Sequence, residues 1–416
     1  MRYKLGIMDM YSVAVNKTVM ENASFFQVFL KEDADYNKLN NSIKNALNYH
    51  PLFKTRLIFD KEYLLETNNK EVIIYNVKVE DRPKEFGKNT NDYLFQVCYF
   101  KNYITFEWCH AVSDGRGALA FLSTILDFYF DIEQKEIPNE FPTECFYEKF
   151  YDKNSKSLLV GKQPKGFKSK DIKIINRGYK CLSHVLKVDT KEVLSVAKKI
   201  DSTPVAVIAP LFCKALRKHL NNKAKNKNVS CGFVIDGRVP LKTPCMHNSV
   251  YNKVITYCDK MDHLDLSMIA TIYRSYLDIA LMKENLIYES TKMINDYKFI
   301  FNLRPKFIRQ LLMKVVAKFS KHSMNNIACT YIGRVPFNDK VKENLLDFRF
   351  RSWPDIGDCV LAISDLNGTL IIDISENYKD EGIIDSFINV CNEYGIHIKE
   401  EEKIIFEQAN VRVDRL

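Results

Sequence analysis

The chain has 416 residues, 46% of them hydrophobic and 27% charged, the balance of a globular protein with a full core, and its length allows two domains or one double-lobed unit. Lysine and arginine (61) outnumber aspartate and glutamate (52). The net charge of +9 suits an acidic ligand, although a lysine-rich solvated surface explains it equally well, and no cluster of aromatic and basic residues indicates nucleic-acid binding.

The cysteines and the apolar runs argue against several classes of protein. Eleven cysteines are scattered without a C-x-x-C pair, so neither a zinc site nor a redox motif is indicated. The N-terminal segment carries Asp9 within its apolar part, so we do not expect it to act as a secretory signal. No apolar run approaches the ~18 residues that a membrane span needs. We therefore expect a cytoplasmic protein with reduced thiols, no metal and no transmembrane segment.

The first 135 residues alternate between strand and helix patterns, which predicts an α/β lobe. Strands are expected at residues 24–30, 54–59, 72–79 and 93–100. A helix over 35–48 is stopped by Pro51. His50 lies at this helix end, where a structural role is more common than catalysis.

The segment 103–121 combines a strand, a short loop and a helix. Ile104, Phe106 and Trp108 alternate with other side chains, as in a β-strand, and from Gly117 the apolar spacing becomes helical. Between them lies an H-x-x-x-D-G hexapeptide, from His110 to Gly115. A lone histidine is usually a structural residue, but its place at a strand-to-helix junction favours a functional one.

The pattern fades over residues 133–177, which we interpret as a long connection. Its lysine-rich part, GKQPKGFKSK, begins at Gly161 and is more typical of a solvated loop than of a phosphate site. Strands are then expected at 181–188, 229–235 and 250–257, and helices at 190–200, 205–216 and 266–286. Asp189 and Glu192 form a possible capping box for the helix that ends near residue 200.

The last quarter of the chain closes with a hairpin and a helix. Residues 305–321 predict a basic amphipathic helix, which can dock on a membrane or a partner but is more often a packed surface helix. Strands are expected at 327–332 and 345–350. Asn367-Gly368 is a hairpin signal between strands 360–364 and 369–375, and a helix over 382–394 follows.

The hexapeptide resembles the signature of the CoA-dependent acyltransferase superfamily, which includes chloramphenicol acetyltransferase, the plant BAHD enzymes, condensation domains and alcohol acetyltransferase-like proteins. Condensation domains usually carry a second histidine where this chain has Cys109. The late D-F-G-W-G sequence of BAHD enzymes is absent. The resemblance therefore favours the alcohol acetyltransferase-like branch.

Two later features resemble the same superfamily. Arg238 follows a strand, like the arginine that reaches the motif aspartate in these proteins, although Asp236-Gly237 replaces a more common Asn-Leu pair. Thr330 begins a T-Y-I-G sequence that is similar to the late strand lining the substrate channel. The resemblance implies two chloramphenicol acetyltransferase-like lobes in one chain with a tunnel between them. We expect the lobes at 1–160 and 181–416, joined by a connection at 161–180.

The resemblance also implies roles for these residues. Neutral His110 would be the general base, and the Thr330 hydroxyl would stabilise the oxyanion by on the order of 3 kcal/mol. Asp114 would turn away from the substrate and pair with Arg238, although capping of the following helix is a competing role. Gly115 would permit a turn or a close backbone approach. Cys109 faces the opposite way from His110 along the strand, so a Cys-His nucleophile is not expected.

The function implied is transfer of an acyl group from acyl-CoA to the hydroxyl of an alcohol, without a covalent intermediate and without a permanently bound cofactor. One alternative is a stand-alone condensation-type enzyme that takes a thioester from an acyl carrier protein and forms an amide or an ester. Another is a non-catalytic binding protein on the same fold, against which the intact His110, Asp114 and Gly115 argue.

Overall fold

A computed structural model gives the fold of the chain. It describes residues 2–6, 9–10, 12–13, 23–60, 62–83, 85–134, 146–159, 161, 163–167, 180–219, 227–303, 308, 311–312, 315, 325–352, 354, 358–377, 382–407 and 410–411. Most of the helix predicted at 305–321 lies outside these residues, as do Lys162, Lys168 and Lys170 of the lysine-rich run.

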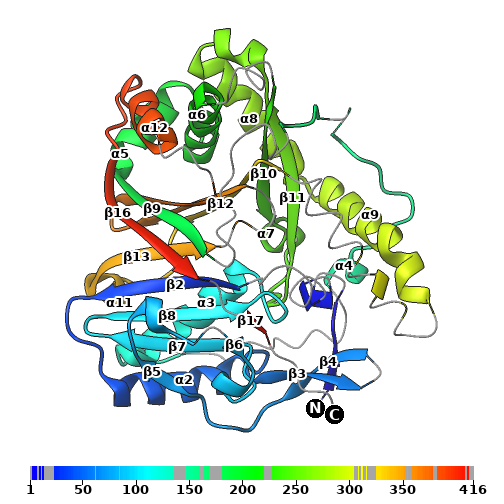
Figure 1. The fold of residues 1–416 in the computed structure, drawn as a ribbon. Coiled ribbons are helices and arrows are strands. Elements are labelled where there is room, and N and C mark those ends of the chain that lie inside the picture. Colours follow the sequence, from blue (N-terminus) through cyan, green and yellow to red (C-terminus); the bar gives the residue numbers. More distant parts are fainter. Residues whose placement is uncertain are drawn as a thin grey trace.

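A five-stranded sheet forms the centre of the first lobe. Its order is β13-β2-β8-β7-β5, and all neighbours are antiparallel except β5 and β7. The strands are β2 (Ala23–Leu30), β5 (Ile74–Asn76), β7 (Phe95–Phe100), β8 (Tyr103–Cys109) and β13 (Leu345–Ser352). Helices α2 (Tyr36–Tyr49) and α3 (Gly115–Tyr129) cover one face of this sheet (Figure 1).

Alternating apolar side chains explain why these elements pack together. Ile104, Phe106 and Trp108 of β8 are at most 1% exposed and lie in one core with the apolar faces of α2 and α3. Phe121 of α3 stacks on Phe53, with ring centroids 4.1 Å apart. Each such aromatic side chain stabilises the fold by about 1.5–3 kcal/mol through burial. This core fixes the angle at which α3 leaves the end of β8.

His50 has the structural place that its position predicts. Its backbone N–H donates to the Ala46 carbonyl at the end of α2, and its ring Nε2 lies 2.8 Å from the hydroxyl of Thr124 on α3. The side chain is buried. It therefore links the two helices of the first lobe.

A seven-stranded sheet forms the centre of the second lobe. Its order is β11-β10-β12-β14-β15-β9-β16, with parallel pairs at β10/β12 and β12/β14. The strands are β9 (Lys180–Asp189), β10 (Val229–Asp236), β11 (Val250–Tyr257), β12 (Ile327–Arg334), β14 (Cys359–Leu366), β15 (Thr369–Glu376) and β16 (Lys399–Glu407). The helices are α5 (Thr190–Lys199), α6 (Pro204–His219), α8 (Leu266–Ala280), α9 (Lys283–Asn302) and α12 (Gly382–Asn392).

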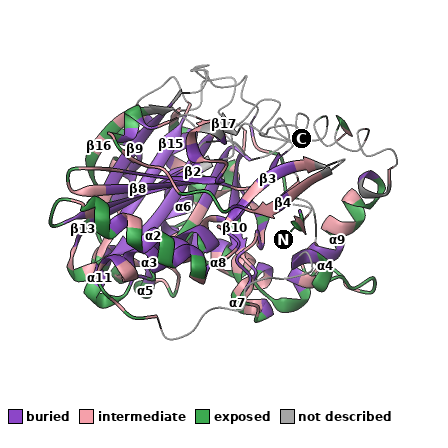
Figure 2. Ribbon diagram, turned by 90° about the horizontal axis from the view of Figure 1, so that it is seen from below, coloured by how far each residue is buried: buried purple, intermediate pink, exposed green. Residues whose placement is uncertain are grey.

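Helices α5, α6, α8 and α12 share an apolar core with one face of this sheet. Figure 2 shows buried residues along the strands and exposed residues on the outer faces of the helices. Asn367 (φ 52°) and Gly368 (φ 83°) both adopt the left-handed conformation between β14 and β15, which confirms the predicted hairpin.

Strand β13 joins the two lobes. It comes from the late part of the chain, yet it pairs with β2 at the edge of the first sheet. The Phe350 amide donates to Asp373 Oδ2 on β15 at 2.9 Å, and Lys187 of β9 pairs with Asp347 at 2.7 Å. The first sheet is thus built from both halves of the sequence. The lobe bounds expected from the sequence stay a prediction.

Part of the expected connection is fixed to the second lobe. Phe167 donates its amide to the Asn228 carbonyl at 2.8 Å, and the Thr256 hydroxyl donates to the Pro164 carbonyl at 2.7 Å. Asn326 reaches the Phe167 carbonyl from the start of β12. Residues 163–167 therefore lie against β10 and β11 rather than extending freely from the lobe.

Three details differ from the sequence-based prediction. The helix expected at 266–286 is two helices, because Met282 is extended (φ −61°, ψ 137°) between α8 and α9. Glu192 completes no capping box, because its carboxylate accepts from the His397 amide while Asp189 alone caps α5. The strand expected at 72–79 shortens to β5, with a 3₁₀ turn at Val79–Asp81.

Smaller elements complete the fold. Strands β1 (Arg2–Lys4), β3 (Thr55–Asp60) and β4 (Glu62–Thr67) form a three-stranded sheet, and β6 (Glu85–Phe86) pairs with β17 (Asn410–Val411). The short helices are α4 (Phe146–Lys149), α7 (Arg238–Leu241) and α11 (Asp339–Glu343). Across the described ranges, no helix combines the length and apolar character needed to cross a membrane.

Candidate active site

The hexapeptide lies at the junction of β8 and α3, as predicted. His110 follows the last residue of β8 and is partly buried in a tight turn, in which the Val112 amide donates to the Cys109 carbonyl at 3.0 Å. Asp114 is the N-cap of α3, and its Oδ1 accepts from the amides of Arg116 (3.1 Å) and Gly117 (3.0 Å). The strand end and the helix start thus hold the two ends of the motif.

Asp114 also forms the predicted contact with the second lobe. Its Oδ1 accepts from Arg238 Nη2 at 2.8 Å, and its Oδ2 accepts from the Ser249 amide at 2.9 Å. The carboxylate is 1% exposed. Burial alone would raise the pKa of Asp114, but the charge and hydrogen bonds of Arg238 hold that pKa below its ordinary value. Capping and ion pairing, considered as competing roles, are both present.

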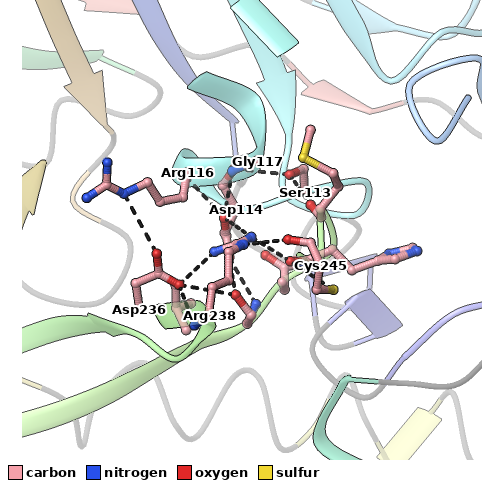
Figure 3. A network of polar contacts seen from close by, with 12 residues as sticks. Ser113, Asp114, Arg116, Gly117, Asp236, Arg238 and Cys245 are labelled. Atoms are coloured by element: carbon pink, nitrogen blue, oxygen red, sulfur yellow. Dashed lines mark hydrogen bonds and ion pairs between the residues drawn. The ribbon is translucent and has the colours of Figure 1, made fainter. Parts of the chain in front are cut away.

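Each nitrogen of the Arg238 guanidinium donates a hydrogen bond (Figure 3). Its Nη1 pairs with Asp236 at 2.9 Å, its Nη2 also donates to the His247 carbonyl at 2.9 Å, and its Nε donates to the Cys245 carbonyl. Burial would lower the pKa of Arg238, but the two carboxylates raise it above its ordinary value. The guanidinium is therefore a fixed cation that joins α7 to the motif loop.

The structure requires a glycine at position 117 rather than at position 115. A Cβ at Gly115 would meet no atom closer than 3.6 Å, an ordinary van der Waals contact. A Cβ at Gly117 would lie 2.1 Å from Ser113 Oγ and 2.4 Å from the Met246 carbonyl oxygen. The close backbone approach expected at Gly115 is therefore found two residues later, at Gly117, outside the hexapeptide.

The surroundings of His110 include residues that the sequence analysis did not select. Asn248 Nδ2 donates to the His110 carbonyl at 2.7 Å and to Asp9 Oδ1 at 2.6 Å. His247 Nδ1 lies 3.7 Å from Asp9 Oδ2. Burial lowers the pKa of His110, while Asp114 and hydrogen bonding with Asn248 oppose the shift. No motif marks these residues, because they come from loops far apart in the sequence.

Thr330 lies on β12 beyond the point where this strand separates from β10. The parallel ladder between the two strands spans Cys231–Phe233 and ends at Cys329. Thr330 is half-buried and pairs in register with Ala362, whose side chain lies in the core of the first lobe, so Thr330 is on the sheet face that is turned toward that lobe. Among the described residues, no hydrogen bond joins Thr330 to His110, Asp114 or Arg238.

The described residues offer no metal site, and a cavity among them lies remote from the motif. They contain no group of three or more His, Cys, Asp or Glu side chains placed to hold a metal ion. A cavity of 590 Å³ lies at the C-terminal end of α3, the opposite end from the motif. Its lining is Asn45, Asn48, Tyr49, Phe128, Asp131, Ile132, Glu133 and Gln134. The tunnel expected between the lobes stays a prediction.

Comparisons with known proteins identify the fold. No protein-family model and no curated protein sequence matches the chain. Solved structures do match over nearly its whole length. F. graminearum TRI101, complexed with coenzyme A and T-2 mycotoxin, has a TM-score of 0.64 at 9% identity and covers 96% of this chain and 99% of its own.

Two other matches come from proteins of different kinds. Polyketide synthase associated protein 5 from Mycobacterium tuberculosis has a TM-score of 0.62 at 11% identity, covering 94% of this chain and 98% of its own. The condensation domain of the Monacolin K polyketide synthase MokA has a TM-score of 0.64 at 10% identity, covering 95% and 96%. Identities this low carry information about the fold alone. The chain has the mixed α/β, two-lobed fold that CoA-dependent acyltransferases share with condensation domains.

Proposed function

We propose that the protein transfers an acyl group from acyl-CoA to the hydroxyl of an alcohol, with His110 as the general base. The observation that carries this proposal is the motif loop itself. His110 follows the last residue of β8, and Asp114 is held in an ion pair with Arg238. The loop thus presents one imidazole and uses its carboxylate for support.

The chemistry follows from a neutral imidazole. Burial lowers the pKa of His110, so the ring is unprotonated near neutral pH and can accept the proton of the acceptor hydroxyl. The alcohol oxygen attacks the thioester carbonyl and forms a tetrahedral intermediate. As the intermediate collapses, the carbon–sulfur bond breaks and the imidazolium returns its proton to the leaving thiolate. The products are an ester and free CoA, with no acyl-enzyme.

Thr330 is the proposed oxyanion donor. Support comes from its position on β12, half-buried and on the sheet face toward the first lobe. Loss of one such donor lowers kcat about 10²–10³-fold. Thr330→Val should therefore lower kcat, whereas Thr330→Ser, which keeps the hydroxyl, should retain most of it. Equal rates in the two variants would remove Thr330 from the mechanism.

Acyl-CoA is the preferred donor because the structure of TRI101 contains coenzyme A. The net charge of +9 suits an acidic donor of either kind, acyl-CoA or a carrier protein. The likeness to a condensation domain supports an alternative donor, an acyl group carried as a thioester by an acyl carrier protein. A non-catalytic binding protein on this fold is the remaining alternative.

The test is release of free thiol from a series of acyl-CoAs in the presence of alcohols and amines. Ester formation from acyl-CoA supports the proposal. Turnover with an acyl carrier protein thioester, together with inactivity on acyl-CoA, would replace it with the condensation-type function. Inactivity with both donors in every combination would favour the binding protein, and mass spectrometry of small molecules that copurify with the chain would then identify what it binds.

A further inference from the structure

Three segments of the chain meet at the side chain of Asn248. Its Nδ2 donates to the backbone carbonyl of His110, at the end of β8, and to the carboxylate of Asp9, near the start of the sequence. The His110 carbonyl oxygen has no proton to offer, so the amide nitrogen must face it. Asn248 and Asp9 are 5% and 4% exposed. The contact is therefore a buried and oriented one.

The loop that carries Asn248 holds the motif at several successive points. The Met246 carbonyl accepts from the Ser113 hydroxyl at 2.6 Å, Asn248 donates to the His110 carbonyl, and the Ser249 amide donates to Asp114. Residues 246–249, in the loop before β11 of the second lobe, thus run alongside the motif loop. Among these contacts, the one from Asn248 reaches His110 itself.

Asp9 orients the Asn248 amide. Its Oδ2 accepts from the Gly6 amide at 3.0 Å, which leaves Oδ1 directed at Asn248. Burial raises the pKa of Asp9, while His247, Asn248 and Gly6 oppose that rise. Asp9 therefore aligns the Asn248 amide, and Asn248 in turn holds the His110 carbonyl.

We propose that Asn248, aligned by Asp9, is a positioning residue that fixes the peptide group from which the His110 ring projects. A buried carbonyl without a partner is costly, so the His110 peptide group would turn if Asn248 were removed. A displacement of about 1 Å at a reacting group can lower a rate about 10²-fold. The effect on turnover rests on the proposed function, but the effect on the His110 ring does not.

The titration of His110 directly reports the contact with Asn248, because the groups around the ring set its pKa. Burial lowers the pKa of His110, and the charge of Asp114 and hydrogen bonding with Asn248 raise it. Asp9 accepts from Asn248, and His247 lies beside Asp9. Loss of the Asn248 side chain should therefore lower the pKa of His110 further, whereas general loosening that lets water reach the ring should raise it toward 6.5.

The experiment compares Asn248→Ala with Asn102→Ala. The Asn102 amide also donates to a backbone carbonyl, that of Leu30 at 2.9 Å, but at the other end of β8. We measure kcat and KM, and we follow the His110 ring by NMR in histidine-labelled protein, with its signal assigned by its absence in His110→Ala. Asn248→Ala should lower kcat about 10²-fold at similar KM and lower the His110 pKa. Asn102→Ala should change neither.

Variants at Asp9 keep the test decisive if Asn248→Ala does not fold. Asp9→Asn retains an oxygen that can accept from Asn248, whereas Asp9→Ala removes it. Asp9→Ala should therefore reproduce the lowered His110 pKa, and Asp9→Asn should largely restore the wild-type titration.

A wild-type His110 titration in Asn248→Ala and Asp9→Ala would overturn the positioning role, whatever reaction the protein performs. A wild-type protein that turns over no acyl donor would instead contradict the proposed function, and the His110 titration would still decide the role of Asn248.

Discussion

Asp114 and Arg238 lie 124 residues apart in the sequence and form a buried ion pair, with Arg238 Nη2 2.8 Å from Asp114 Oδ1. The same carboxylate caps α3 and accepts the Ser249 amide. The pair therefore fixes the His110 loop of the first lobe to α7 and to the loop before β11 in the second lobe. One side chain of the motif thus contacts α3, α7 and the loop before β11.

Asp114→Ala should lower the free energy of unfolding by about 3 kcal/mol, toward the lower end of the range for a broken buried pair, because Asp236 still neutralises Arg238. Denaturant unfolding measures the loss. Asp265→Ala is the matched control, because Asp265 caps α8 from an exposed position, and such a cap contributes about 1 kcal/mol.

The loss at Asp114 should also depend on pH in a defined direction. The folded-state pKa of Asp114 is below its ordinary value of 3.8, so the carboxylate stabilises the fold above about pH 4, and this contribution is lost as the pH falls through the lowered pKa. An Asp114→Ala protein that unfolds like Asp265→Ala at neutral pH would contradict this role.

The two glycines at the start of α3 should respond differently to alanine. Gly117→Ala should be destabilised by about 1–3 kcal/mol, because the new Cβ meets Ser113 and the Met246 backbone. Gly115→Ala should unfold within about 1 kcal/mol of the wild type, because its Cβ has space and alanine favours a helix. Thermal and denaturant unfolding of both variants checks the difference. Equal losses would show that the close approach is not where the contacts place it.

Asp373→Asn should stabilise the protein at neutral pH. Burial raises the pKa of Asp373 from 3.8 to about 6, although Arg351 and Arg349 lower it. The folded-state pKa of Asp373 is higher than its ordinary value, so ionisation of this carboxyl group lowers the free energy of unfolding. The loss is absent below about pH 4, grows up to about pH 6 and is complete above it. The complete loss corresponds to at most roughly 3 kcal/mol.

The measurement is denaturant unfolding of Asp373→Asn and wild type at about pH 8 and about pH 4. The gain should be present at the higher pH and absent at the lower one. Asn can still accept from the Phe350 amide, so that contact is retained. Asp385→Asn, an exposed carboxyl on α12, is the control and should change little at either pH. Destabilisation of Asp373→Asn at the higher pH would contradict the prediction.

The pH dependence of acyl transfer should reflect a lowered pKa at His110. The base must be neutral, so kcat/KM should fall on the acid side with a midpoint below pH 6.5, the ordinary pKa of an imidazole. Rate measurements from about pH 5 to about pH 8 check this, with protein stability followed in parallel. An acid limb centred above pH 6.5 would contradict the lowered pKa of His110.

Local patterns made the centre of the fold predictable. The alternation in β8, the apolar stripe of α3 and the Asn367-Gly368 turn are short-range signals, and the structure confirms each. The break at Met282 was not predictable in this way, because apolar spacing continues from α8 into α9. Strand β16 was missed because it is a charged edge strand, KEEEKIIFE.

The site was predictable where a motif or a resemblance marked it. His110, Asp114 and Arg238 were selected in this way, and the pair between the last two is present. Asn248 and Asp9 carry no motif, and they meet across 239 residues of sequence only once both lobes have formed. Gly117 was missed because the atoms that exclude its Cβ, Ser113 Oγ and the Met246 carbonyl oxygen, come close to it only in the folded chain.

The central claim is that His110 is the base for acyl transfer, and the most direct test is the rate of thiol release by His110→Ala with acyl-CoA and an alcohol that the wild type accepts. The control is His263→Ala, at an exposed histidine of the second lobe. We predict that His110→Ala folds like the wild type and loses about 10²–10⁴-fold in kcat, while His263→Ala retains it. A His110→Ala protein that transfers the acyl group at the wild-type rate would contradict the claim.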